Sequence, residues 1–335
     1  MEDHLQNLKL QSPLLAYLLK RNWVARQTGP HQEFVGLCPL HAESEPSFYV
    51  NADKNVFYCH GCGRGGDVIR FVQLYLNLSF HDTLAHLNQE FGLPEPSQAE
   101  MLEAAAAFYE QQLYRHGEAL DYLHGRGVHD PRLIRQLQIG YAPGGTLRRH
   151  LTLLGYPSEL LLRAGLINRQ GRDTLYHRIV FPCFDQNRLI NLYGRNLGAA
   201  VPHRFLARPK GGLFAWNVVR LHPAVIVVEG LFDLAILWQE GFVNTTCCYV
   251  TRLSETQLSQ LCEPPGREVL IAFDCDPNGA GQSASRCLAQ RLGAAGVTAR
   301  IVEFPDGYDP NSYFHSGGNA EDFRRRTELA EVLQP

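Results

Sequence analysis

The sequence lacks the features that would place it in a membrane or a secretory pathway. No apolar run approaches the roughly 20 residues that a membrane-spanning helix needs. The opening residues, MEDHLQNLKL, lack the charged and then apolar pattern of a secretory signal. There is no internal repeat and no low-complexity tract, and 45% hydrophobic residues over 335 positions allow two or three domains with buried cores. We therefore expect a multidomain protein located in the cytoplasm, without a membrane partner.

The sequence also lacks a strong net charge. Its 31 Lys and Arg residues against 34 Asp and Glu residues give a formal net charge of −3, which argues against indiscriminate binding of nucleic acid. The distribution is uneven, because Arg148 to Arg220 contains 12 basic residues, 11 of them Arg, and only three acids. This local excess predicts a phosphate-binding surface. A solvated charged face is the alternative that charge patterning leaves open.

Cysteine is present in a spacing that predicts a zinc site. GLCPLH and YCHGCG form C-x2-H, seventeen residues, then C-x2-C, so that Cys38, His41, Cys59 and Cys62 can converge on one tetrahedral ion. The alternating segment between the pairs suits the hairpin of a zinc ribbon. His60 lies between two ligands and is expected to point away from the metal. Four protein ligands leave no open position, so the zinc is expected to be structural. The remaining six cysteines are expected to pack as small hydrophobes: Cys183, Cys247, Cys248, Cys262, Cys275 and Cys287.

The segment from Gly36 to Phe80 resembles the CHC2 zinc-binding domain of bacterial primases along its whole length. In that family the domain helps to hold and read the single-stranded template. The resemblance makes Arg64 and Lys54 candidate phosphate contacts. It also offers a base-stacking platform among four aromatic residues, although strand aromatics of a small ribbon mostly form its core. These residues are Phe48, Tyr49, Phe57 and Tyr58.

The carboxyl-terminal half predicts a parallel sheet with acids at one edge. AVIVVEG, TTCCYVT, REVLIAFDCD and VTARIVEFP are strand-like and alternate with helical segments. Glu229 closes the first strand, Asp274 and Asp276 close the third, and Asp309 follows the fourth. Because ligands bind beyond the carboxyl ends of such strands, these acids are predicted to hold Mg²⁺ or Mn²⁺ together. Solvated acids at helix starts are the alternative, above all for Asp233, which can simply favour the first turn of its helix.

The motifs E-G-x-x-D (Glu229 and Asp233), D-x-D (Asp274 and Asp276) and D-P-N-S (Asp309) resemble a TOPRIM domain, and the resemblance makes these five acids the candidate catalytic residues. Gly279, Ala280 and Gly281 fit its small-residue turn. Upstream, IGYAPGGTLRRHL, HRIVFPCFD, LYGRNLG and RFLARPKGGLFAWN match in order the amino-terminal part of a DnaG-type RNA polymerase domain. The resemblance implies a primase that joins ribonucleoside triphosphates on single-stranded DNA. It further implies four basic contacts to template or nucleotide: Arg178, Arg195, Arg204 and Lys210.

The sequence departs from the family pattern at several positions. A basic residue is often found where this chain has Trp216, and an acid is common where it has Asn311, a weaker metal ligand. Pro277 and Asn278 lengthen the D-x-D turn, and Val250 to Ser254 read VTRLS where the family favours a small, glycine-started turn. Only about twenty residues follow Phe314, so the helicase-binding domain is expected to be absent. A separate replicative helicase or mobile-element replication protein is then the expected partner. A plasmid, phage or other mobile element is the expected origin of the gene.

The expected fold class is a multidomain α/β protein. The expected parts are a zinc-ribbon domain at 1–93, a linker at 94–100, a mixed α+β basic subdomain at 101–222, a TOPRIM parallel-sheet subdomain at 223–318 and a carboxyl-terminal helix at 319–335. Two other functions stay open: a single-stranded DNA-binding accessory protein that has lost polymerase activity, and a TOPRIM nuclease that uses the same acids.

Overall fold

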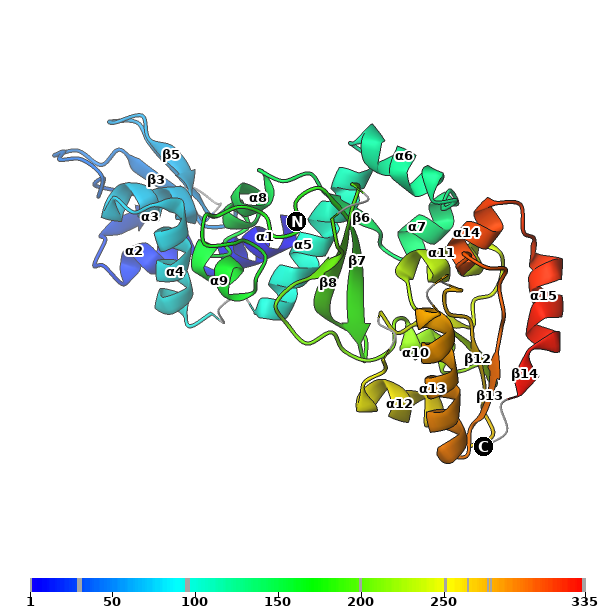
Figure 1. The fold of residues 1–335 in the computed structure, drawn as a ribbon. Coiled ribbons are helices and arrows are strands. Elements are labelled where there is room, and N and C mark those ends of the chain that lie inside the picture. Colours follow the sequence, from blue (N-terminus) through cyan, green and yellow to red (C-terminus); the bar gives the residue numbers. More distant parts are fainter. Residues whose placement is uncertain are drawn as a thin grey trace. The chain divides into compact units, whose positions relative to one another are not determined.

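The computed structural model describes residues 2–28, 32–93, 97–198, 201–249, 252–263, 265–275, 277 and 279–332. The chain divides into two compact units, and the elements of each can be followed in Figure 1. Unit 1 is Met1–Met101 with Arg148–Arg163, and unit 2 is Leu102–Leu147 with Ala164–Pro335. Among the described residues no helix has the length and apolar character that crossing a membrane requires.

Unit 1 contains an antiparallel sheet in the order β1-β2-β3-β4-β5. Its strands are β1 (Ala25–Gln27), β2 (Glu33–Gly36), β3 (Phe48–Asn51), β4 (Val56–Cys59) and β5 (Gly65–Asp67). Its helices are α1 (Glu2–Gln11), α2 (Leu14–Leu19), α3 (Val68–Leu76), α4 (Phe80–Phe91), α9 (Ser158–Arg163) and most of α8 (Leu147–Leu153). The alternation read from the sequence is therefore a hairpin: Phe48 and Phe57 point into the core with Phe71, whereas Tyr49 and Tyr58 are exposed.

Unit 2 begins within α5 (Gln98–Leu113) and contains two sheets. The first is antiparallel in the order β6-β7-β8-β9, and the long β7–β8 hairpin dominates it. Its strands are β6 (Gly140–Ala142), β7 (Arg178–Asp185), β8 (Arg188–Asn196) and β9 (Arg204–Phe205). The helices before and after it are α6 (Gly117–Gly125), α7 (Pro131–Gln136) and α10 (Trp216–Val219).

The second sheet of unit 2 has the order β11-β10-β12-β13-β14, and its first four strands are parallel, as the alternation of strands and helices predicts. These strands are β10 (Ala224–Val228), β11 (Thr245–Cys247), β12 (Glu268–Ile271), β13 (Thr298–Ile301) and β14 (Glu331–Val332). The helices are α11 (Leu231–Gln239), α12 (Glu255–Cys262), α13 (Ala280–Ala294), α14 (Pro310–His315) and α15 (Ala320–Leu329). One apolar core joins β7, β10, β12 and α11, so the two sheets share their buried side chains.

Two local features differ from the expected layout. Helix α5 starts at Gln98, within the segment expected as a linker, and is separate from α6. The last helix ends at Leu329, and Glu331–Val332 pairs antiparallel with β13. In the last case tertiary pairing overrides the helix propensity of a Glu- and Leu-rich segment.

Candidate active site and zinc site

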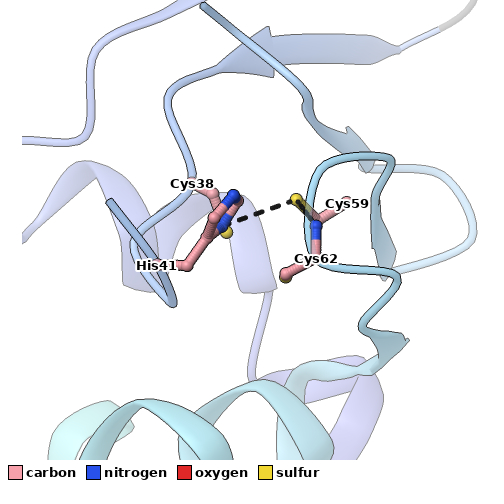
Figure 2. A group of neighbouring side chains, drawn as sticks. All are labelled: Cys38, His41, Cys59 and Cys62. Carbon is pink, nitrogen blue, oxygen red and sulfur yellow. Dashed lines mark hydrogen bonds between the residues drawn. The ribbon is translucent and has the colours of Figure 1, made fainter. Parts of the chain in front are cut away.

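Four potential zinc ligands come from two facing turns of unit 1. Cys38 and His41 follow β2, Cys59 ends β4, and Cys62 lies in the turn before β5. Their ligand atoms all lie within 4.8 Å of one another, and Figure 2 shows the side chains pointing toward a common centre. Zinc–sulfur bonds of about 2.3 Å in a tetrahedron place ligand atoms about 3.8 Å apart, so a small contraction would complete the site. The donor set, three cysteines and one histidine, fits one structural Zn²⁺.

The side chain of Glu43 orients the histidine ligand. The Nδ1 of His41 faces the Sγ of Cys59 at 3.9 Å, and its Nε2 lies 3.2 Å from Oε2 of Glu43. Oε1 of Glu43 accepts a hydrogen bond from the amide of Cys38 at 2.7 Å. The hydroxyl of Ser47 donates to Glu43, and this bond lowers the pKa of the Glu43 carboxyl. A carboxylate on the outer nitrogen of a ligating histidine fixes its tautomer and increases its basicity.

His60 packs against two tyrosines on the solvent-exposed face of the ribbon and is not among the four residues that converge on the zinc site. The ring of His60 packs edge-on against Tyr49 and Tyr58, at centroid distances of 5.3 and 5.0 Å. The two tyrosines are 39% and 49% exposed, whereas Phe48 and Phe57 are core residues. The guanidinium of Arg64 donates to the carbonyl of Leu40 at 2.8 Å and so ties the two zinc turns together. Of the four aromatic candidates, the two tyrosines are therefore the accessible ones.

In unit 2, acids from separate segments line one cleft of 260 Å³. Glu229 directly follows β10, Asp274 follows β12, and Asp309 caps the amino terminus of α14 by accepting from the amide of Ser312. The start of α13 approaches the Asp274 main chain so closely that a Cβ at Gly281 would overlap its carbonyl group. The small-residue turn thus lets α13 pack against the segment that carries Asp274. Asp276 lies outside the described residues.

Asp233 is the most deeply buried acid of the cleft, at 6% exposure. Its carboxylate accepts from the amides of Gly230 and Asn311, each at 3.1 Å. Burial, together with the charges of Asp309 and Asp274, raises the pKa of Asp233 well above its ordinary value. The alternative role of Asp233, to favour the start of its helix, is therefore incomplete, because its carboxylate also joins α11 to α14. Neighbouring carboxylates that raise the pKa of Asp233 favour a bound cation, and oxygen donors are those that Mg²⁺ prefers.

The basic residues expected to contact template or nucleotide do not all lie in one place. Arg195 lines the acidic cleft together with His203. Arg178 and Arg204 line a second pocket of 650 Å³, in which Arg178 is almost fully buried and donates to the carbonyl of Tyr176 at 2.9 Å. Lys210 lies over the ring of Phe205, 4.8 Å from its centroid. The structure therefore does not bring all four cations to one surface patch.

The cleft residues that sequence reasoning missed include Arg126, Tyr193 and His203. His203 stacks on Tyr193 with ring centroids 5.4 Å apart, and burial and the charge of Arg195 lower its pKa. These residues come from the end of α6, from β8 and from the segment before β9, and no local spacing links them to the acids. Trp216, by contrast, lies outside the residues that line the cleft and stacks against the guanidinium of Arg267 at 4.8 Å.

Comparison with known families gives three matches in chain order. Residues 3–102 match the CHC2 zinc finger, residues 108–218 match the amino-terminal domain of the DNA primase catalytic core, and residues 224–320 match the Toprim domain. The zinc ligands fall within the first of these segments and the acids of the cleft within the last. The basic residues that line the cleft fall within the second segment.

Individual relatives are similar to most of this chain. A DNA primase of Aquifex aeolicus is 32% identical over 324 residues, which cover 89% of this chain and 64% of that protein. The solved zinc-binding and RNA polymerase domains of the Aquifex aeolicus primase are similar with a TM-score of 0.63 at 28% identity, over 98% of this chain and 86% of that one. A DnaG primase catalytic domain bound to single-stranded DNA is similar with a TM-score of 0.58 at 26% identity, over 70% of this chain and 81% of that one. The chain thus spans less than two thirds of this curated relative's length.

Proposed function

Because this chain belongs to the DnaG-type primase family, we propose that it is a DNA primase, which synthesises short RNA primers on single-stranded DNA from ribonucleoside triphosphates. The observation that carries the proposal is the convergence of Glu229, Asp233, Asp274 and Asp309 on one cleft that also holds cationic side chains. A chain with only a zinc ribbon, or only scattered strand-end acids, would not support it.

The acids of the cleft would divide the work of nucleotidyl transfer. Mg²⁺ or Mn²⁺ bound there would neutralise the charge that develops on the phosphates. Glu229, Asp274 and Asp276 would provide ligand oxygens, and Glu229 would also help to position the attacking 3′-hydroxyl. Asp309 would complete the acidic group from the start of α14. Asp233, with both carboxylate oxygens engaged by amides, would hold α11 and α14 in register and so fix the geometry of its neighbours.

The single strand would be held at separate surfaces of the two units. On the zinc ribbon, Tyr49 and Tyr58 offer exposed rings for base stacking, and Lys54 and Arg64 supply positive charge. In unit 2, Arg178, Arg195, Arg204 and Lys210 would contact template or nucleotide phosphates, for which planar guanidinium groups are well suited. A similar catalytic domain has been solved with single-stranded DNA, which supports this assignment.

The remaining features of the proposal concern context. The domain boundaries at 93, 100, 222 and 318 stay proposals. A separate replicative helicase or mobile-element replication protein is the proposed partner. A mobile-element origin stays a prediction. The cytoplasm is the proposed location, since the relatives are DNA primases.

Primer synthesis tests the proposal. Zinc-loaded protein is incubated with single-stranded DNA, the four ribonucleotides and Mg²⁺ or Mn²⁺, and labelled products are separated by length. We expect short RNA products from the wild type and none from Asp274→Ala combined with Asp276→Ala. No product from the wild type, or undiminished product from the double variant, would refute it.

One observation favours a second candidate, a single-stranded DNA-binding accessory protein without polymerase activity. Where an acid is expected, Asn311 is buried, and its amide donates to the carbonyl of Arg126 at 2.6 Å. Salt-dependent DNA binding that persists without divalent metal, together with no nucleotide incorporation, would favour this candidate. Fragments of labelled DNA in the same reaction would instead indicate a nuclease.

A further inference from the structure

Two stacked aromatic rings line the acidic cleft and have no part in the function proposed above. Tyr193 and His203 line the same 260 Å³ cleft as Glu229, Asp274 and Asp309. Their ring centroids are 5.4 Å apart, and their ring planes differ by 25°, so that the two rings stack nearly parallel. Carboxylates and basic groups are sufficient to bind a metal and phosphates, and the rings therefore require a separate explanation.

The pairing of β8 with β9 brings the two rings together. Tyr193 lies opposite Phe205 in the antiparallel register, so the next neighbours across the two strands on the same face are Arg195 and His203. Side chains alternate along a strand, and these four residues therefore share one face of the pair. Three of them, Tyr193, Arg195 and His203, line the cleft.

The ring of His203 is supported by aromatic core residues. Tyr193, which covers one face of the imidazole, is 7% exposed. Phe205 packs edge-on against both rings, with centroid distances of 5.2 Å to Tyr193 and 6.3 Å to His203. The buried ring of Tyr249 packs at right angles to Phe205 at 5.3 Å. His203 itself is exposed. A supported ring that lines a cleft and stays exposed can accept a further flat ring.

We propose that His203 stacks on the base of the nucleoside triphosphate bound in the catalytic cleft. The inference rests on the proposed function and adds a base contact to that site. The acids suit the metal and Arg195 suits the phosphates, and the stacked rings suit the flat, neutral part of the same molecule. Stacking accepts each of the four bases, because every base has a π face, and copying of a varied template requires this tolerance.

The base could also come from the template strand, but the cleft favours the nucleotide. His203 lies with the acids that would hold the metal-bound triphosphate. Arg178 and Arg204, which are candidate template contacts, line a different pocket. The experiment below therefore includes a probe for each source of the base.

Binding of Mg·GTP to the zinc-loaded full chain, measured by isothermal titration calorimetry, tests the proposal. His203→Ala removes the ring, and His203→Phe keeps a flat ring without the imidazole nitrogens. His124→Ala is the matched control, because His124 is exposed in α6 and does not line the cleft. Mg·tripolyphosphate, which has phosphates but no base, is the second probe, and a twelve-residue oligothymidylate is the third. Thermal melting reports whether each variant is folded.

We expect His203→Ala to weaken Mg·GTP binding about 5- to 150-fold, the range that loss of one base–aromatic contact produces. His203→Phe is expected to stay within about threefold of the wild type, because the ring and not its nitrogens carries the contact. His124→Ala should bind as the wild type does. The affinity for Mg·tripolyphosphate should not respond to any of the three substitutions.

Four outcomes would overturn the proposal: no binding of Mg·GTP by the wild type, unchanged binding by folded His203→Ala, an equal loss of Mg·tripolyphosphate affinity, or a loss confined to the oligothymidylate. Failure of the proposed function is distinguishable from these. A wild type that binds Mg·GTP through His203 but makes no primers refutes primer synthesis and leaves the base contact intact.

Discussion

Replacing Gly281 with Ala adds one methyl group at the start of α13. This methyl group points at the main chain of Asp274. The added Cβ would lie 2.9 Å from the carbonyl carbon of Asp274 and closer still to its oxygen, whereas ordinary contact begins at 3.4 Å. The neighbours are main-chain atoms, so no side-chain rotation relieves the overlap. The start of α13 and the Asp274 segment must move apart by about 1 Å, a shift of the size that overpacking produces.

The expected effects follow from that displacement. Overpacking costs about 1–3 kcal/mol of stability. A misplacement of about 1 Å near reacting groups can lower the catalytic rate about 100-fold. Helix propensity acts in the opposite direction, since Ala in place of Gly favours a helix by about 0.5–1 kcal/mol. Gly293→Ala in the same helix isolates this second effect, because a Cβ at Gly293 meets nothing within 4 Å.

The assay compares the two variants with the wild type by thermal melting and by primer synthesis. We expect Gly293→Ala to melt at or above the wild-type temperature with full activity, and Gly281→Ala to melt lower and lose most of its activity. Equal stability and equal activity of the two variants would refute the argument that α13 is packed against the Asp274 main chain.

Three further predictions concern single side chains. Burial raises the pKa of Asp173 to about 6, above the unfolded value of 3.8, so the free energy that Asp173 contributes to folding falls as the pH rises from about 4 to 6. Relative to Asp173→Asn, the wild type should lose about 3 kcal/mol of unfolding free energy across that range, measured by urea unfolding at each pH. Glu43→Gln should weaken zinc binding about 10-fold, because the outer nitrogen of His41 loses its carboxylate partner. Competition with a chelator measures the zinc affinity, and Glu45→Gln, at an exposed position, should leave it unchanged. Asn311→Asp should lower the stability without metal by about 2 kcal/mol, because a carboxylate cannot donate to the Arg126 carbonyl. Added Mg²⁺ should restore part of the lost melting temperature. A melting temperature equal to that of the wild type in both conditions would contradict the argument.

The features that could be predicted from the sequence are those set by local spacing. Two ligand pairs on turns of a hairpin define the zinc site without knowledge of any other segment. Alternation of strands and helices likewise predicts that β10 to β13 run parallel, and the strand ends then bring Glu229 and Asp274 to one edge. In both cases a short-range pattern is sufficient because backbone geometry fixes the rest.

The features that escaped prediction depend on packing between distant segments. Arg126 and His203 enter the cleft only because α6 and the β7–β8 hairpin pack beside the second sheet, and Asn311 becomes a hydrogen-bond donor to Arg126 for the same reason. No proline in the sequence marks the break between α5 and α6. The pairing of Glu331 with β13 depends on an edge that only the folded sheet provides.

The measurement closest to the central claim is the binding of Mn²⁺ to the zinc-loaded chain, detected by electron paramagnetic resonance. If carboxylates from separate segments jointly hold the cation, the wild type should bind Mn²⁺, and Glu229→Gln and Asp274→Asn should each release it while the zinc content stays constant. Mn²⁺ binding that survives both substitutions unchanged would contradict the account, because the acids would then not act together as a metal site.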